Sequence, residues 1–468
     1  VDQWREAIAT SQKILHGYGI TAVTDAAANR GALEAFKSLD DAGELKMRVD
    51  FVIMMNDYMG DVTEPWKILE DRRQYTTRLI KANKAKWGAD GVPIAGTSLM
   101  LEPYDNKPES YGQMTATDRE LNQFSKALGM GAQLMVHSVG DGTARKVLDA
   151  VAKARALHPE NKLPVQLAHA VFVHPDDIKR MKELNVIAEI SPPMYFWDST
   201  TVSTIPVLGK ERIKRAHPIN RMLEEGLLVT YGSDWPASAP TANPWRCLEG
   251  MVTRLNPEGK YKEYGPLGEP IELAAAIRIF TLNGAAAMGN DQVTGSIVVG
   301  KYADMVLLDQ SPFDLMESGD AGRIGDMKTL RTLFEGEIVF DRQAAIKALD
   351  VIDVEITNEN LNNAVDAAQL NLLVEKDLAG GVNCRCFPGF ANPIAPGSSS
   401  APDDVNRAFG SLLERGYRFA RHARQIAWKD EGNYWIQWAL RDYETAVLFA
   451  YDPESNAAVE VLRVKENR

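Results

Sequence analysis

The 468-residue sequence is poor in cysteine, has no long apolar run and carries no excess of positive charge. Three cysteines cannot form a disulfide framework, which fits a reducing compartment. No apolar stretch is long enough to span a bilayer. The formal charge of −12 argues against nucleic-acid or anionic-membrane partners. We therefore expect a soluble globular protein that acts on a small molecule, located in the cytoplasm, while a periplasmic or secreted location stays open.

Several sequence motifs are also missing. The chain has no G-x-S-x-G, H-E-x-x-H or Walker motif, and no G-x-G-x-x-G turn follows an expected strand. There is no signal peptide. The chain begins with Val1, within a helical pattern, so we expect the natural N-terminus to lie upstream.

Alternating strand and helix patterns fill the first part of the chain. Such βα repeats predict a parallel sheet with right-handed crossovers. An eight-fold (β/α)8 barrel needs eight units, and the pattern gives seven. We therefore predict an α/β, TIM-like barrel without its first strand, and an open doubly wound sheet is the alternative. The expected strands are Gly19–Asp25, Met47–Met55, Lys84–Gly91, Gln133–Gly140, Val165–Val171, Asn185–Pro193 and Leu227–Asp234. A charged stretch ending near Lys81 reads as helical.

The pattern changes after the barrel. Short β-segments around glycine turns, at Thr294–Leu308 and Leu330–Phe340, indicate one flank of a small β-sandwich. A stretch rich in Pro, Gly and Ser follows and reads as a linker. Beyond it we expect a helix at Asp404–Ala427 and strands over Tyr434–Val464. The predicted domains are the barrel at 1–288, a sandwich segment at 289–345, an extension and linker at 346–402, and a small α+β unit at 403–468.

Four polar residues lie at the ends of predicted barrel strands: Lys86, His137, His169 and Asp234. Active sites of such barrels lie at the carboxyl ends of the strands. Alternation along the strands places Met135 with His137, Leu167 with His169, and Thr230 with Asp234 on inward faces. Imidazole and carboxylate are good zinc ligands, and a bound metal would make hydroxide available near neutral pH. We predict that the four residues hold one or two divalent ions, zinc first, with Asp234 also as general base.

Each of these residues also has a structural reading. A single histidine near a strand end is more often a core or turn residue, and a lysine there is usually solvated. Asp234 could cap the next helix. The aromatic group at 195–197 could line a pocket or pack against the C-terminal tail, and Cys384 and Cys386 fit a plain loop better than a metal site.

Four stretches together resemble the amidohydrolase superfamily, in particular its YtcJ-like branch with enzymes of the N-substituted formamide deformylase type. They are LMVHSVGDGTARKVLDAV, VQLAHAVFVHPDDIKRMKELNVIAEISPP, LLVTYGSDWPASAPTANPW and TGSIVVGKYADMVLLDQSPFD, in the family's order. The resemblance covers roughly Val1 to Phe340. It implies a (β/α)8 barrel, a composite β-sandwich, and hydrolysis of an amide or similar non-peptide C–N bond by metal-activated water.

The resemblance also assigns roles to individual residues. Lys86 matches the lysine that becomes carboxylated and bridges two metals. His137 and His169 match the histidines of the family's fifth and sixth strands. Asp234 matches the aspartate of the eighth strand, which binds metal and acts as general base. Gly300 to Asp304 matches the sandwich segment.

The sequence departs from the family at one point: it contains no His-x-His pair, which the family carries on its first strand. The chain is then either a fragment or has lost that strand with part of its metal site. A metal-dependent hydrolase is our first prediction. The alternative is an inactive or truncated homologue with a binding or regulatory role, and a third option is Schiff-base chemistry at Lys84 or Lys86. A homo-oligomer stays open.

Overall fold

The computed structural model describes most of the first 344 residues and part of the remainder. The described residues are 2–58, 63–191, 194–237, 239, 241–344, 407, 418–419, 424–427, 433–440, 445–452 and 457–465. The chain forms two compact units, Val1–Asp341 and Arg342–Arg468. The extension and linker expected at 346–402, which includes Cys384 and Cys386, lies outside the described residues.

The first unit is built on a curled sheet of seven parallel strands. The strands follow one another in sequence order, with β1 and β7 at the two edges of the sheet. The seven predicted strands and the TIM-like fold class are thereby confirmed. The strands are β1 Ala22–Ala28, β2 Arg48–Met54, β3 Ile80–Gly88, β4 Gln133–Ser138, β5 Val165–His169, β6 Val186–Ile190 and β7 Val229–Tyr231.

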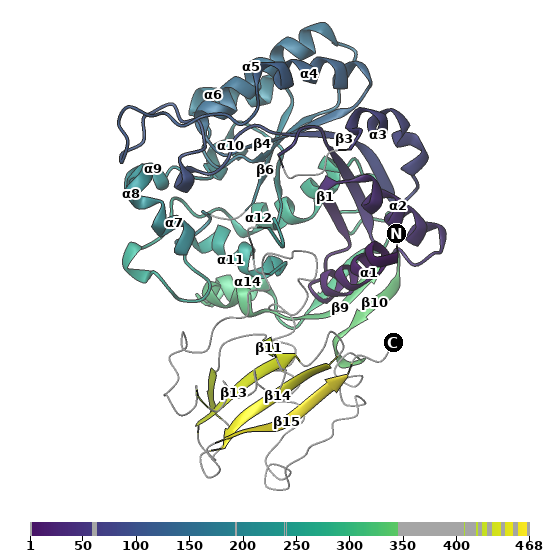
Figure 1. The fold of residues 1–468 in the computed structure, drawn as a ribbon, viewed down its shortest axis with the longest axis vertical. Helices are drawn as coiled ribbons and strands as arrows, with labels where there is room; N and C mark the ends of the chain where they lie inside the picture. The colour runs from purple at the N-terminus through teal and green to yellow at the C-terminus, as the bar shows by residue number, and fades with distance from the viewer. Residues whose placement is uncertain are drawn as a thin grey trace. The chain divides into compact units, whose positions relative to one another are not determined.

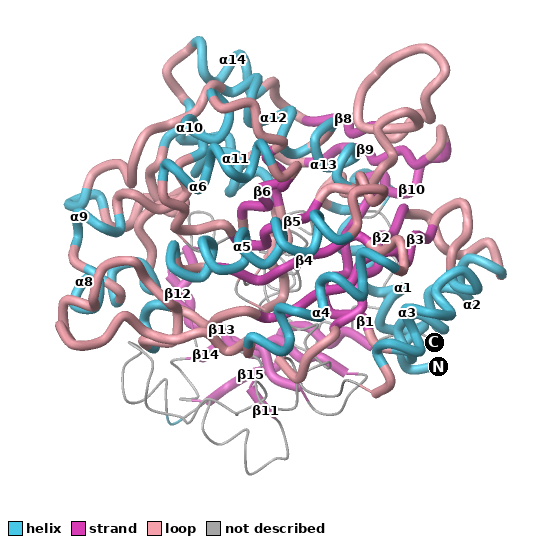
Figure 2. Tube along the Cα trace, turned by 90° about the horizontal axis from the view of Figure 1, so that it is seen from above, coloured by secondary structure: helices cyan, strands magenta, loops and turns pink. Residues whose placement is uncertain are grey.

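Helices connect these strands and cover the outer face of the sheet (Figures 1 and 2). Local signals set where they begin: Thr117 and Glu120 form a reciprocal capping box at α4, and Pro175 and Asp176 open α6. The helices of the barrel are α1 Asp2–Gly17, α2 Arg30–Asp41, α3 Pro65–Asp71, α4 Asp118–Gly129, α5 Asp141–Leu157, α6 Pro175–Glu183, α7 Ser199–Ser203, α8 Ile205–Leu208, α9 Lys210–Ile213, α10 Ile219–Glu224, α11 Pro244–Thr253, α12 Leu273–Phe280 and α13 Leu282–Ala287.

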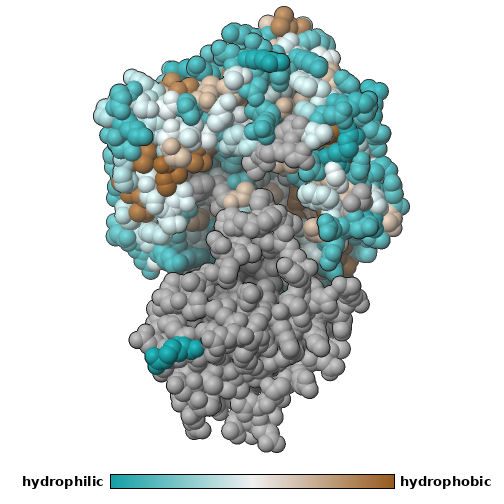
Figure 3. Space-filling model, viewed as in Figure 1, coloured by the Kyte–Doolittle hydropathy of each residue, from teal (hydrophilic) through white to brown (hydrophobic). Residues whose placement is uncertain are grey.

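The face of this unit seen in Figure 3 is largely hydrophilic, with small hydrophobic patches. Among the described residues, no helix has the length and apolar character needed to cross a bilayer.

Strand residues alternate between two apolar environments. Side chains facing outward join the helices in one large core, which includes Leu134, Val136 and Leu167. Those facing inward form a small separate cluster of Val52, Met135 and Ala168. The inside of the sheet is therefore packed rather than open, and polar side chains lie in layers on either side of this cluster.

Strand β3 begins earlier than its pattern indicates, and the charged helix predicted to end near Lys81 is wrong at its end. Helix α3 ends at Asp71, and Lys81 lies within β3. The misplaced residues are those up to Lys81, whose charge reads as helix surface but whose ammonium donates from the strand to the carbonyls of Met288 (2.8 Å) and Gly289 (2.6 Å). Lys84, on the same strand, is buried inside the barrel, where it forms an ion pair with Asp50.

A three-stranded antiparallel sheet follows the barrel in the order β10-β9-β8. Its elements are β8 Met305–Leu308, α14 Pro312–Glu317, β9 Thr329–Phe334 and β10 Glu337–Asp341. The predicted hairpin at Leu330–Phe340 is confirmed, but only the second of the two segments predicted in Thr294–Leu308 is a strand. Residues 297–299 are exposed and pair with none of the strands that the structure describes, so their apolar character alone does not make them β-structure.

Buried Arg48 ties this sheet to the barrel. It forms ion pairs with Asp304 and Glu335, and its guanidinium lies over the rings of Tyr302 and Phe334. Asp304 closes the Gly-Lys-x-Ala-Asp pattern, so a motif noted for its family resemblance has a structural task here.

The described part of the second unit is an antiparallel sheet. Its strands are β11 Arg418–Phe419, β12 Arg424–Ala427, β13 Asn433–Leu440, β14 Thr445–Asp452 and β15 Ala457–Lys465. The strands expected over Tyr434–Val464 are confirmed. The helix expected through Ala427 is wrong at its end, because residues 424–427 pair with β13, and strand pairing outweighs helical propensity.

Candidate active site

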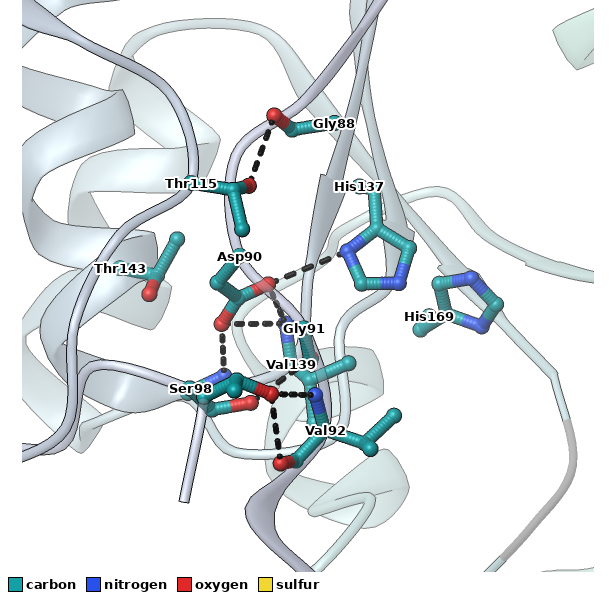
Figure 4. A network of polar contacts seen from close by, with 12 residues as sticks. Gly88, Asp90, Gly91, Val92, Ser98, Thr115, His137, Val139, Thr143 and His169 are labelled. Atoms are coloured by element: carbon teal, nitrogen blue, oxygen red, sulfur yellow. Dashed lines mark hydrogen bonds and ion pairs between the residues drawn. The ribbon is translucent and has the colours of Figure 1, made fainter. Parts of the chain in front are cut away.

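The two predicted histidines meet at the carboxyl ends of adjacent strands. His137 is near the end of β4, His169 is the last residue of β5, and their rings pack edge to face with centroids 4.5 Å apart. Figure 4 shows the two imidazoles side by side. Lys86 of β3 lies close enough to lower the pKa of His169, and Asp234 lies within electrostatic range of Lys86. The structure therefore brings all four predicted residues to one end of the sheet.

His137 is held by a carboxylate that the sequence analysis did not single out. Fully buried Asp90 accepts hydrogen bonds from the backbone N–H groups of Val139 (3.0 Å) and Gly140 (2.9 Å). Its Oδ1 is also 3.1 Å from His137 Nδ1 (Figure 4). Because an ionised carboxylate only accepts, this network assigns the proton to Nδ1 and leaves a lone pair on His137 Nε2. Such an outer partner is what orients a metal-binding histidine.

His169 reaches the site by a different route from the one predicted. Gln166 and Ala168 face the interior, whereas Leu167 packs in the outer core, so the predicted inward face of β5 is wrong. His169 would then point outward. Instead its backbone is left-handed, with φ of 68°, followed by Ala170 at 41°. This turn at the strand end brings the imidazole to the mouth. The left-handed backbone costs conformational free energy, and residues other than glycine adopt it mainly at turns and functional sites.

Two oxygen atoms secure His169 in this conformation. Its Nδ1 lies 2.7 Å from Ser191 Oγ, and its backbone N–H donates to Glu189 Oε2 at 3.1 Å. Burial, aided by His137 and Lys86, holds the pKa of His169 well below its ordinary value. The imidazole is therefore neutral at physiological pH, which is the form that donates to a metal.

Lys86 lies among three carboxylates: Glu189, Asp234 and Asp25. Burial lowers its pKa even though all three acids favour the charged form. Burial also raises the pKa of Glu189 to about 7 and raises that of Asp25. Burial thus disfavours the charged forms of one lysine and two acids at this site, a pattern common at functional sites.

Close packing explains the glycine that ends β7. A Cβ on Gly232 would lie 2.1 Å from Glu189 Oε1, so only glycine lets the chain pass this carboxylate on its way to Asp234. Asp234 itself has a left-handed backbone, with φ of 48°.

One tyrosine also enters the site. The hydroxyl of Tyr58 lies 3.2 Å from His137 Nε2, and the two rings are 5.0 Å apart. No sequence pattern points to Tyr58, because it lies in a turn after β2. Glu189 had a signal that was not used: it is a single charge inside an otherwise apolar strand.

Two expectations made from the sequence can be settled by contacts. Lys84 donates to Gln166 (3.0 Å) and to the carbonyl of Ala287 (3.1 Å), and it pairs with Asp50 at 2.5 Å. With its ammonium protons engaged it is not a nucleophile, which removes it as a Schiff-base candidate. Tyr195 and Trp197 are both 1% exposed and belong to apolar cores, so they line no open pocket.

Comparison with known proteins now identifies the family. The model of the amidohydrolase family matches residues 2–340. The chain belongs to the amidohydrolase family. The resemblance predicted from its motifs is thereby confirmed, and its YtcJ-like character is supported by curated relatives.

One relative is the putative amidohydrolase YtcJ of Bacillus subtilis. It is 26% identical over 314 residues, and the match covers 61% of this chain and 57% of the relative. Another is the N-substituted formamide deformylase of Arthrobacter pascens, 24% identical, covering 72% of this chain and 61% of the relative. Protein LONG AFTER FAR-RED 3 of Arabidopsis thaliana is 25% identical, covering 67% and 54%. The chain thus spans less than two thirds of the length of these relatives.

A solved structure supports the fold. An uncharacterized metal-dependent hydrolase from Pyrococcus horikoshii superposes with a TM-score of 0.56 at 21% identity, covering 68% of this chain and 62% of that one.

The donor atoms at this end of the sheet fit a divalent metal in type. Two imidazoles are held through Nδ1, with a carboxylate and a lysine nearby. Within the described ranges there is no set of three His, Cys, Asp or Glu side chains spaced to hold an ion by themselves.

Proposed function

We propose that this chain is a metal-dependent hydrolase that cleaves an amide or related non-peptide C–N bond of a small molecule. The observation that carries the proposal is the pair of imidazoles anchored by Asp90 and Ser191, which face a buried lysine and Asp234 at the mouth of an amidohydrolase barrel. The deformylase named above acts on a bond of this class, which supports the same choice here.

In this proposal Lys86, His137, His169 and Asp234 would hold one or two ions, with zinc first because nitrogen and oxygen donors suit it. The metal, when bound, would supply an activated water at neutral pH. The residues of the chain do the rest. Asp90 and Ser191 fix the two rings, and Asp234 accepts the proton that the water loses. Glu189 supports the backbone of His169 from the adjacent strand.

Lys86 has the form that its proposed role requires. Because burial lowers its pKa, a larger share of the amine is neutral than in a solvated lysine. A neutral amine can add to CO2, which forms an N–C bond and releases a proton, to give an anionic carbamate. This modification would convert the lysine from a poor ligand into an oxygen donor.

The first test is the metal content of the purified chain. Elemental analysis of the wild type should find about one or two equivalents of zinc or a similar ion. His137→Ala should lose most of it, whereas His158→Ala, at a histidine whose ring nitrogens lie 3.1 Å from Ser125 Oγ and Glu160 Oε1, should not. A folded wild-type protein that takes up no metal would contradict the proposal.

The second test is Asp234→Asn, assayed on a panel of N-substituted formamides and simple amides. Asparagine suits the left-handed backbone at this position, so the fold should persist. Loss of the base should lower turnover by about 10²- to 10⁴-fold. The matched control is Asp176→Asn, at an exposed aspartate of α6, which should retain full activity. Wild-type turnover in Asp234→Asn would remove this residue from the mechanism.

A non-catalytic binding or regulatory protein is the second candidate. The observation that favours it is the contact of the Tyr58 hydroxyl with His137 Nε2, the atom that a metal would use. The metal analysis separates the two candidates, because only the hydrolase requires an ion at this position.

A further inference from the structure

The turn after β2 delivers a tyrosine to a metal-ligand atom. Tyr58 follows the strand end at Met54 by four residues, and its ring passes over the end of β3 to reach His137 on β4. Its hydroxyl lies 3.2 Å from His137 Nε2. The side chain is half-buried, so it is enclosed by the site rather than extended into solvent.

The position of Tyr58 is built by its neighbours. Asn56 pairs with both backbone groups of Gly88: its amide donates to the carbonyl at 3.1 Å, and its oxygen accepts from the N–H at 3.0 Å. This fastens the turn to the end of β3. A Cβ on Gly88 would lie 2.0 Å from the Tyr58 ring, so glycine is needed for the ring to lie there. Two independent features thus place the tyrosine.

The direction of the hydrogen bond follows from the opposite side of the imidazole. Asp90 accepts the Nδ1 proton of His137, so Nε2 carries the lone pair, and the Tyr58 hydroxyl must be the donor.

A metal ion needs the same lone pair. We propose that Tyr58 is a displaceable cap on His137 Nε2, which holds the ligand oriented in the metal-free protein and leaves when a divalent ion binds. The inference rests on the proposed function, since it concerns loading of the same site. Metal binding must break this hydrogen bond, so Tyr58 weakens the affinity of the site for the ion by about the free energy of one hydrogen bond. Until the ion binds, the same bond holds the imidazole of His137 in place.

The test is a zinc titration of the metal-stripped protein in competition with a chromophoric chelator. Removing the hydroxyl in Tyr58→Phe keeps the ring and deletes the bond, so zinc should bind about three- to tenfold more tightly. The matched control is Tyr18→Phe, which removes a hydroxyl bonded to Thr241 at the same 3.2 Å, away from the histidines, and should leave the dissociation constant unchanged. Gly88→Ala forces the ring out by a separate route and should shift affinity in the same direction, and Tyr58→Ala replaces it if that variant fails to fold.

Each outcome decides a distinct point. Equal zinc affinity in wild type and Tyr58→Phe overturns the cap and leaves the proposed function standing. Weaker binding in Tyr58→Phe also overturns it, because the tyrosine would then support the metal. Zinc binding in neither protein, with both folded, overturns the cap and the metal-dependent hydrolase together. Zinc binding in Tyr58→Phe alone supports both.

Discussion

Two lysines on the same face of strand β3 differ in whether their amines have hydrogen-bond partners. Lys84 and Lys86 are two residues apart on β3, and both side chains are buried inside the barrel. Lys84 is matched by Asp50, Gln166 and a backbone carbonyl. Lys86 faces three acids, but no hydrogen bond joins its amine to any residue that the structure describes. In the inner layer, the partners of Lys84 hold its positive charge in place, which stabilises the fold. At the mouth, the amine of Lys86 is not held in this way and is available for chemistry.

The strongest way to break this comparison is to remove each lysine in turn. Lys84→Met should lower the free energy of unfolding by about 3–5 kcal/mol, because Asp50 would remain as an unpaired buried charge. Lys86→Met should cost less than about 1 kcal/mol, since a methionine of similar length replaces a group whose burial is already unfavourable. Urea denaturation of the metal-free proteins measures both. Equal losses would show that the two layers do not differ.

A buried acid on helix α11 sharpens the comparison. Glu249 accepts the backbone N–H of Gly325 at 2.8 Å, while nearby Arg246 pairs with Glu258 instead. Burial raises the pKa of Glu249 to about 7. Between the ordinary pKa of a glutamate and about 7, Glu249 is protonated in the folded state and ionised in the unfolded state. The stability of the wild type therefore falls as the pH rises toward 7.

Glu249→Gln keeps an acceptor for Gly325 and cannot titrate. It should be more stable than wild type by on the order of 2 kcal/mol at pH 8, with the difference vanishing near pH 4. Thermal unfolding across this range tests the point. A constant difference between the two proteins would mean that one backbone hydrogen bond is enough to keep a buried carboxylate charged.

The last prediction concerns the orientation of His169 at the mouth of the barrel. Ser191→Ala removes the partner of His169 Nδ1 and should weaken zinc binding by about 10- to 100-fold. Ser138→Ala is the control, because Ser138 is the register neighbour of His169 and its buried hydroxyl has no hydrogen-bond partner among the described residues. Equal zinc affinity in the two variants would remove the orienting role of Ser191.

The sequence was sufficient to predict the order of the strands and the polar residues that lie at their ends. Apolar runs bounded by turns mark each parallel strand, because both of its faces are buried. The route of His169 into the site could not be predicted, since it depends on a left-handed residue that breaks the strand alternation, and sequence patterns assign that conformation only to glycine or asparagine. Tyr58 and Asp90 were missed for another reason: their roles come from contacts between distant segments.

Both His169 and Asp234 hold a backbone conformation that costs a residue with a side chain about 1–2 kcal/mol. The fold would be more stable with glycine or asparagine at either position. A library selected only for heat resistance should therefore accumulate substitutions at these two positions early and lose the active site before it loses the barrel. Enrichment at 169 and 234 would identify this mouth as the place where the molecule gives up stability for function.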